Sequence, residues 1–276
     1  MISLLLLACG NIVYVTPSVD PTLTSDKDGA IMVYVPQGKF TMGLGDQEHL
    51  SSPAHQVILD AYWIDRAEVT NAMYAKCVAH GVCKEPVNKS SSTQSSYYSN
   101  SDFDNFPVIY VDWNMAQTYC EWRGDKLPTE AQWEKAARGT DGRIYPWGEN
   151  INCSYANYYW SPPNYMLWES SDYCVGDTTK VGNYEKGKSP YGLYDMIGNV
   201  SEWVADWAGA VYEPNSTLVN PQGPATGVYR MTRGGSWRDI PFPVSLSMSL
   251  SVVEDIRSEF DTRDDVGFRC AHEISP

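Results

Sequence analysis

The stretch Tyr191-Gly-Leu-Tyr-Asp-Met-Ile-Gly-Asn-Val-Ser-Glu-Trp203 decides the fold of this 276-residue chain. It places Asp195 and Glu202 seven residues apart, with Gly198 between them. Calcium takes several oxygen ligands and combines carboxylates with backbone carbonyls. The spacing therefore predicts a calcium site. The alternative is a capped turn in which Glu202 forms an ion pair.

This stretch lies in a long region, from Arg143 onward, that is rich in Gly, Pro, Asn, Trp and Tyr and has few periodic runs. We expect irregular but ordered structure there, held by aromatic packing. No internal repeat and no second linker interrupts the chain, which favours one domain from about residue 30 to 272. Five tryptophans are assigned to packing rather than to a sugar-stacking surface: Trp113, Trp122, Trp133, Trp147 and Trp203.

Upstream of this region the sequence predicts short strands at Ile31–Val35 and Gln56–Ile64, because β-branched and aromatic residues cluster in both. Three helices are expected further along. The first runs from Asn71 to His80 behind the cap residue Thr70.

The other two helices carry stronger end signals. Asp112 can cap a helix over residues 113–123 that Gly124 ends, and Thr129-Glu-Ala-Gln132 is a capping box for a helix that ends at Arg138. The stretch from Val87 to Asn105 is rich in Ser, Tyr and Asn and should be a surface loop.

The charge of the chain excludes one class of partner. There are 20 Lys and Arg against 34 Asp and Glu, so the formal net charge is −14. A domain this acidic repels phosphate backbones, which argues against nucleic acid. Hydrophobic residues make up 43 % and aromatic residues 13 %, so the bulk of the chain should fold.

The N-terminus has the features of a secretory segment. Residues 1–9 end in Leu6-Leu7-Ala8-Cys9, which is similar to a bacterial lipoprotein signal box, although no Lys or Arg precedes the apolar run. Cleavage there would leave a lipidated Cys9 as the only membrane attachment. Residues 10–29 are expected to be a flexible tether, and residues 30–276 the folded domain.

The cysteines point to an oxidising compartment. Without Cys9, six remain, an even number that can pair completely, and six cysteines allow 15 connectivities. Local spacing favours Cys77 with Cys83 and Cys153 with Cys174. Zinc is the competing interpretation, but there is no Cys-x-x-Cys and no His at ligand spacing. We therefore expect an extracytoplasmic, cell-surface or secreted protein.

A series of motifs, in one order along the chain, resembles the formylglycine-generating enzyme (sulfatase-modifying factor) family. Beyond the opening stretch they are Met32-Val-Tyr-Val-Pro-Gln-Gly-Lys-Phe-Thr-Met-Gly43, Glu68-Val-Thr-Asn71, Pro107-Val-Ile-Tyr-Val-Asp-Trp113, Lys126-Leu-Pro-Thr-Glu-Ala-Gln-Trp-Glu-Lys-Ala-Ala-Arg-Gly139, Tyr145-Pro-Trp-Gly148, Arg233-Gly-Gly-Ser-Trp237 and Gly267-Phe-Arg-Cys270. The resemblance implies an α+β, C-type-lectin-like fold with much irregular coil. It also implies a Cys120–Cys270 disulfide and bound calcium.

Active members of this family oxidise a substrate cysteine with copper and dioxygen, through two cysteines placed five residues apart after Gly-Gly-Ser. Here those positions hold Asp239 and Val244, and no cysteine lies between Cys174 and Cys270. Cu(I) prefers thiolate ligands. We therefore expect no catalytic residues at this site, no bound copper or iron, and no formylglycine-generating activity.

The resemblance also implies ligands for one or two calcium ions. One set comprises the side chains of Asp195 and Glu202 with the carbonyls of Gly198 and Val200. A second would fall near Asn157 and Tyr158, with a carboxylate from Asp172 or Asp177.

The segment from Arg238 to Val266 is the least family-like part of the chain, and we expect an unknown protein, peptide or glycan ligand near it. The leading interpretation is a calcium-stabilised binding module. One alternative is a metal-dependent oxidative enzyme using nonheme iron or copper. Another is a lectin-like display protein diversified by a retroelement.

Overall fold

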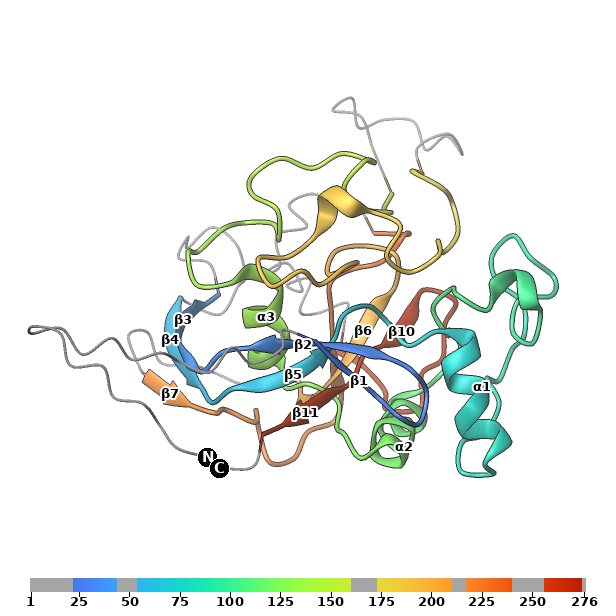
Figure 1. Cartoon of the computed structure of the whole chain (residues 1–276), viewed down its shortest axis with the longest axis horizontal. Coiled ribbons are helices and arrows are strands. Elements are labelled where there is room, and N and C mark those ends of the chain that lie inside the picture. Colours follow the sequence, from blue (N-terminus) through green and yellow to red (C-terminus); the bar gives the residue numbers. More distant parts are fainter. Residues whose placement is uncertain (1–21, 44–53, 160–172, 210–216, 240–255, 275–276) are drawn as a thin grey trace, which may run out of the picture.

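The computed structural model describes residues 22–43, 54–159, 173–209, 217–239 and 256–274. Helices and short strands alternate with long stretches of coil (Figure 1). The helices are α1 (Asn71–Ala79), α2 (Trp113–Arg123) and α3 (Glu130–Arg138), with single 3₁₀ turns at Ser101–Phe103 and Glu185–Gly187. No helix in these ranges has the length and apolar character needed to cross a membrane. This is the expected α+β architecture.

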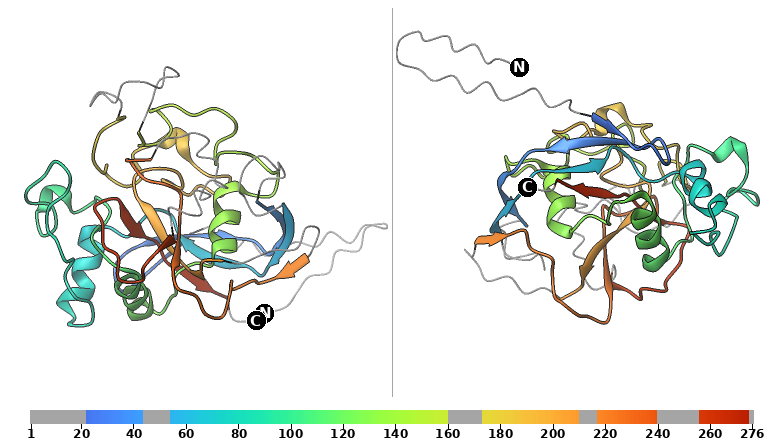
Figure 2. Two further views of the ribbon diagram at one scale, coloured as in Figure 1. Left: turned by 180° about the vertical axis from the view of Figure 1, so that it is seen from behind. Right: turned by 60° about the horizontal axis from the view of Figure 1, so that its bottom comes forward.

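Three small sheets make up the β structure. The first has the order β1 (Thr22–Thr24), β2 (Ile31–Val35), β5 (Tyr62–Asp65) and β11 (Ala271–Glu273), all antiparallel. The second has the order β10 (Val266–Phe268), β6 (Ser201–Trp207), β8 (Arg230–Arg233) and β9 (Ile256–Arg257). The third joins β3 (Gly38–Met42), β4 (His55–Leu59) and β7 (Thr217–Val219). Figure 2 shows α2 and α3 packed beside these sheets.

The helix ends follow the predicted capping signals. The side chains of Thr70, Asp112 and Thr129 accept hydrogen bonds from backbone N–H groups in the first turns of α1, α2 and α3, and the capping box of α3 is complete. Gly124 ends α2 with φ of 95°, a left-handed conformation that glycine adopts without a Cβ clash. Local chemistry therefore fixes the ends of these helices.

The strand predictions were less complete. Ile31–Val35 is confirmed as β2, but Gln56–Ile64 is split into β4 and β5 by Asp60 and Ala61. The seven-residue strand β6 lies in the region expected to be irregular. Its first four residues are all buried, so the alternation that marks a half-exposed strand is missing.

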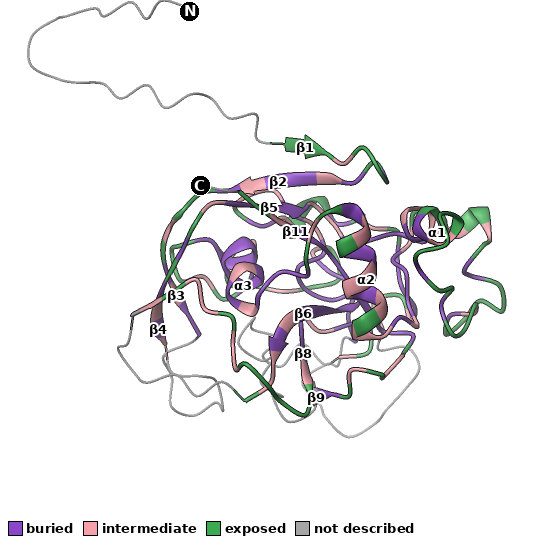
Figure 3. Cartoon of the chain, turned by 90° about the horizontal axis from the view of Figure 1, so that it is seen from below, coloured by how far each residue is buried: buried purple, intermediate pink, exposed green. Residues whose placement is uncertain are grey.

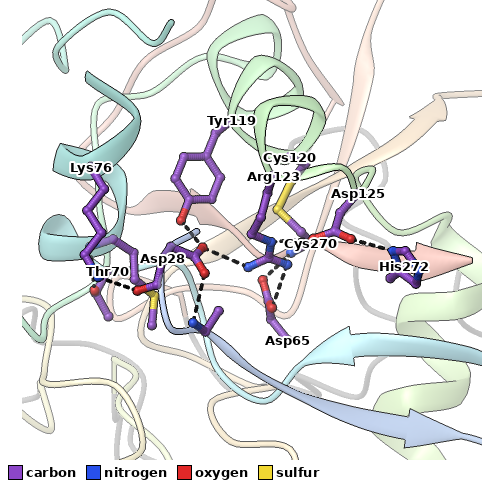
Figure 4. Close-up of polar contacts among 12 residues, drawn as sticks. Asp28, Asp65, Thr70, Lys76, Tyr119, Cys120, Arg123, Asp125, Cys270 and His272 are labelled. Atoms are coloured by element: carbon purple, nitrogen blue, oxygen red, sulfur yellow. Dashed lines mark hydrogen bonds and ion pairs between the residues drawn. A yellow bond between two sulfur atoms is a disulfide. The ribbon is translucent and has the colours of Figure 1, made fainter. Parts of the chain in front are cut away.

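The folded part begins earlier than residue 30. β1 pairs with β2 through Thr22↔Val33, inside the range expected to be a flexible tether. The following loop carries Asp28, whose carboxylate is buried against Arg123 and accepts a hydrogen bond from Tyr119 (Figure 4). A buried ion pair anchors this loop to α2, which sequence composition did not reveal.

Arg123 is the centre of a buried polar network that ties β5, α2 and β11 together (Figure 4). Its Nη2 lies 2.7 Å from Asp65, its Nε contacts Asp125, and Asp125 lies 2.8 Å from His272 Nδ1. Asp65 also accepts a hydrogen bond from the backbone N–H of Cys270. Burial raises the pKa of Asp65 to about 6 despite the opposing charge of Arg123.

Two main apolar clusters form the core, one around α3 and β2–β5 and the other around α1, α2 and β10. Figure 3 shows buried residues concentrated on the inward sides of these elements. Trp133 and Trp203 are completely buried, which agrees with the packing role expected for them. Trp113 and Trp147 are only partly buried.

Candidate functional site

Three disulfides cross-link the chain, and they are the pairs that spacing and family resemblance indicated. Cys77 pairs with Cys83, Cys120 with Cys270, and Cys153 with Cys174. The Cα atoms in the three pairs are 5.3, 5.6 and 5.4 Å apart, within the usual range for disulfides. Cys9 lies outside the described residues.

The opening stretch of the sequence contributes to a buried group of charges, here called the carboxylate centre: Glu68, Asp195, Glu202 and Arg269. Glu202 lies in β6, and Arg269 lies in the link between β10 and β11. Arg269 Nε and Nη2 each lie 2.6 Å from one oxygen of Glu202. Trp133 Nε1 donates to Glu202 Oε2 at 2.8 Å. The ion pair considered for Glu202 is therefore present.

The carboxylate centre holds three acidic groups and one guanidinium. Burial raises the pKa of Glu68 well above its usual range, and the charge of Asp195 raises it further. Burial also raises the pKa of Asp195 to about 6, although Gly182 N–H donates to its carboxylate at 2.6 Å. With all three acids ionised, Arg269 leaves two negative charges uncompensated. Protons or a cation must balance them, because buried charges are costly when unpaired.

The turn before β6 contains backbone carbonyls close in sequence to two of these acids, Asp195 and Glu202. Asp195, Gly198 and Asn199 all have positive φ, and a Cβ on Gly198 would lie 2.2 Å from the carbonyl oxygen of Asn157. Among the described residues, no hydrogen bond ends on the carbonyl oxygen of Gly198 or Val200. These free carbonyls and two carboxylates are the donor types that calcium uses.

A cation here would depend on those carbonyls. In the described part of the chain no three His, Cys, Asp or Glu side chains are arranged as metal ligands. The residues of the first predicted set, Asp195, Gly198, Val200 and Glu202, do lie within one turn and the start of one strand. Their oxygens are of the types that calcium prefers, and a cation here would have to share Glu202 with Arg269.

The carboxylate of Asp177, one of two candidates for the second predicted calcium set, is occupied by hydrogen bonds. Asp177 is buried, but Ser91 and Thr93 donate to one oxygen of its carboxylate at 2.6–2.9 Å. Its other carboxylate oxygen accepts from Thr178 N–H at 2.7 Å. Asn157 Nδ2 donates to the backbone carbonyl of Asp177 at 2.7 Å, and its Oδ1 has no partner among the described residues. The Asp177 carboxylate therefore anchors the loop of residues 91–93, and Asp172 lies outside the described residues.

Asp239 occupies the position of the first family thiol, and its side chain is tied locally. Ser236 donates to Asp239 Oδ2 from its backbone N–H at 2.6 Å and from its hydroxyl at 2.8 Å. The carbonyl of Asp239 accepts from Tyr159 N–H. Burial raises the pKa of the Asp239 carboxyl. Val244, the second family position, lies outside the described residues.

The described residues around Asp239 carry aromatic and charged side chains. Arg238 pairs with Asp264 at 2.6 Å, and the Tyr173 ring lies 5.7 Å from the ring of Trp237. Trp237 is buried, so the surface beside Asp239 is formed by the exposed Arg238 and the partly exposed Tyr173.

Sequence reasoning missed two members of the carboxylate centre, Glu68 and Arg269. Both stand in motifs quoted for the family resemblance, Glu68-Val-Thr-Asn71 and Gly267-Phe-Arg-Cys270. Arg269 lies 67 positions from Glu202 in the sequence, so no local pattern connects them. The signal available in the sequence was that both residues stand in motifs shared with the family.

Comparisons with known proteins agree with this architecture. The family model for the sulfatase-modifying factor enzyme 1-like domain matches residues 19–274. The formylglycine-generating enzyme of Thermomonospora curvata is 32 % identical over 257 residues, covering 75 % of this chain and 82 % of that protein. The serine/threonine-protein kinase pkn1 of Chlamydia pneumoniae is 33 % identical over 94 % of this chain, but the match spans only 39 % of the kinase.

Solved structures show the same fold. Treponema denticola variable protein 1 superposes with a TM-score of 0.68 at 24 % identity, covering 92 % of this chain and 98 % of that one. PvdO from Pseudomonas aeruginosa gives a TM-score of 0.65 at 25 % identity, with the same coverage. On the family match, the identities and the shared fold, this chain belongs to the formylglycine-generating enzyme (sulfatase-modifying factor) family.

Proposed function

We propose that this chain is an extracytoplasmic, calcium-stabilised binding module of the formylglycine-generating fold, without cysteine-oxidase activity. The observation that carries the proposal is Asp239. It stands where the family has a copper-binding thiol, and its carboxylate accepts two hydrogen bonds from Ser236.

The lack of thiols supports the loss of oxidase chemistry. Cu(I) is held by soft sulfur ligands, and neither Asp239 nor Val244 supplies one. Every cysteine other than Cys9 is in a disulfide. The two family thiol positions therefore hold a carboxylate and an apolar residue type.

The charge of the carboxylate centre supports calcium. Three buried acids share one guanidinium, and two backbone carbonyls close in sequence to Asp195 and Glu202 have no described donor. A divalent cation would neutralise the two remaining charges and use those carbonyls. Glu68, Asp195, Gly198, Val200 and Glu202 are the residues that would hold or neutralise it.

The disulfides support an oxidising location, since three pairs persist in secreted and surface proteins far more often than in the cytosol. Lipid attachment at Cys9 completes the proposal: the domain would lie at the cell surface on a short linker. Its ligand, a protein, peptide or glycan, would contact the surface near Arg238 and Asp264.

Metal content and activity measured together test this proposal. The chain is purified from an oxidising compartment, dialysed without chelator and analysed by elemental mass spectrometry, then incubated with Cu(I) and a cysteine-containing sulfatase peptide. Calcium near one per chain and no aldehyde product are expected. Stoichiometric copper or iron, or aldehyde formation, would overturn the proposal and favour an oxidative enzyme.

The diversified-display alternative has its own test. It requires a near-copy of the codons for Arg238 to Arg269 beside a reverse-transcriptase gene, with adenines at the variable positions. Such a template would identify the binding module as a diversified display protein. Its absence would leave a module with a fixed ligand.

A further inference from the structure

A separate pocket lies between α2 and α3, in a part of the molecule that the proposed function does not use. It has a volume of about 160 Å³ and is bounded by α2, α3, β6, β8 and β11. These elements lie together in the view of Figure 3. A cavity of about 150 Å³ accommodates one six-membered ring. The pocket is therefore large enough for a single ring.

Arg230 is the distinctive residue of this pocket. Its guanidinium carbon lies 3.5 Å from the ring centroids of both Trp113 and Trp207, so the group is held between two indoles. Within the described ranges it makes one hydrogen bond, from Nη1 to the carbonyl of Ala205, and no ion pair. The two indoles stabilise the cation through their π faces, but they do not neutralise it.

The charged side chains that line the pocket are Lys126, Arg230 and Glu273, which leaves one positive charge in excess within the lining. Lys126 and Glu273, both lining it, pair with each other at 2.9 Å. Arg230 therefore has no acid of its own in the pocket wall, and the charges of Glu259 and Asp206, which do not line the pocket, act on it without an ion pair in the described ranges. Burial lowers the pKa of Arg230, and the charges of Glu259 and Asp206 oppose that shift only in part. An anionic group on a ligand would supply a negative charge beside Arg230.

Three glutamines provide neutral hydrogen-bonding groups in the wall. Gln132 uses its oxygen in the capping box, so its NH₂ group has no described acceptor. Gln117 and Gln222 use their NH₂ groups on Glu121 and Asn220, which leaves both side-chain oxygens without a described donor. Leu127, Ala205 and Ala271 supply apolar surface. The wall can thus both donate to and accept from hydroxyl groups while covering a ring face.

We infer that this pocket binds a carboxylate-bearing sugar unit, such as a uronic acid. The carboxylate would lie near Arg230 and Lys126, the hydroxyl groups against the glutamine amides, and the ring against the apolar wall. This site is independent of the surface near Asp239, so it can exist whether or not that surface binds a ligand.

The test uses the full chain and two matched sugars, D-glucuronate and D-glucose. Binding is followed by the indole N–H resonances of Trp113 and Trp207 in NMR titrations at pH 7. Saturable shifts are expected with glucuronate, with an affinity at least about tenfold higher than for glucose, because one charge-assisted contact contributes roughly 1.5–3 kcal/mol. Raising the salt concentration should weaken the response.

Variants assign the response to the pocket. Arg230→Met should abolish the preference for glucuronate, and Lys126→Gln should weaken binding about threefold, consistent with an exposed charge contributing under 1 kcal/mol. Lys180→Gln is the control, because Lys180 is exposed and does not line the pocket. Lys126→Gln keeps the test valid if the Arg230 variant does not fold.

Two outcomes would overturn the inference. One is that neither sugar gives a saturable shift, or that both bind equally. The other is that glucuronate binds equally well to the wild-type chain and to both pocket variants, which would locate its site elsewhere.

Discussion

Arg269 and Arg230 have very different interaction partners in this fold. Arg269 is completely buried, holds both oxygens of Glu202 and donates to the carbonyls of Asp65 and Tyr194. Arg230 is only partly buried, is held between two indoles and donates to one carbonyl. The first arrangement is complete and serves the structure. The second leaves a cation at the wall of a pocket without an ion pair among the described residues, although the charges of Glu259 and Asp206 act on it, and such a group is suited to binding.

The same substitution at both arginines tests this contrast most strongly. Arg269→Met should destabilise the chain by about 3–5 kcal/mol, because Glu202 would remain buried without its cation. Urea denaturation at pH 7 measures the loss. A change below about 1 kcal/mol would mean that Glu202 is neutralised in another way.

Added calcium tests whether a cation neutralises the acids of the carboxylate centre that Arg269 does not neutralise. Calcium at a hundred times its dissociation constant should stabilise the chain by about 2.7 kcal/mol at pH 7. At pH 5 the effect should be small, because Asp195, with its pKa raised to about 6, is then protonated. Thermal unfolding with calcium or with EDTA at both pH values measures this.

The sign of the pH dependence follows from the raised pKa values. Without calcium, the folded chain retains protons on Asp195 and Glu68 that the unfolded chain releases. Stability in EDTA should therefore be highest near pH 4 for these groups and should fall as pH rises through 6. A profile in EDTA that rises from pH 5 to 7 would contradict this account of the centre.

Arg230→Met is expected to cost about 1 kcal/mol or less. Methionine can keep the apolar contact between Trp113 and Trp207, while the loss is one hydrogen bond to Ala205 and a cation that lacks a paired acid. Urea denaturation beside Arg269→Met gives the comparison directly. A cost similar to that of Arg269→Met would show that Arg230 is a structural residue.

The smallest effect on stability is expected at the edge of the pocket. Glu273→Gln removes the pair with Lys126, in which both side chains are more than half exposed, so stability should change by less than about 0.5 kcal/mol. The freed Lys126 should strengthen glucuronate binding in the NMR titration. Weaker binding would indicate that Glu273 itself contacts the sugar.

The elements that the sequence predicted well are those whose signals are local. The ends of α2 and α3 follow from caps three residues away, and Gly124 lies where a left-handed residue is needed. β6 was missed because it lies between β10 and β8 in the sheet and its side chains are buried on both faces at its start, so the alternation of an exposed strand is absent. The ordered start at Thr22 was missed because Asp28 depends on Arg123, 95 positions away.

The candidate site shows the same difference between features with local sequence signals and features that depend on distant contacts. The sequence placed the two carboxylates of the opening stretch, the six pairing cysteines and the missing thiols, because each depends on residue identity at known spacing. It did not supply Glu68 or Arg269 as neighbours of Glu202, nor the position of Asp177 against the loop of residues 91–93. Those contacts join distant segments, and many sequences of similar composition could join them differently.

By itself, then, the sequence determined the helix ends, the six cysteines available for disulfides and the absence of thiols after Gly-Gly-Ser. These features follow from local geometry and side-chain chemistry. Only the tertiary structure decided that Glu202 neutralises Arg269 and that Arg230 forms no ion pair among the described residues. Partner choice depends on the folding of segments 67 or more positions apart, and on which groups that folding removes from water. For that reason Arg269 has a complete set of partners while Arg230 faces a pocket without one.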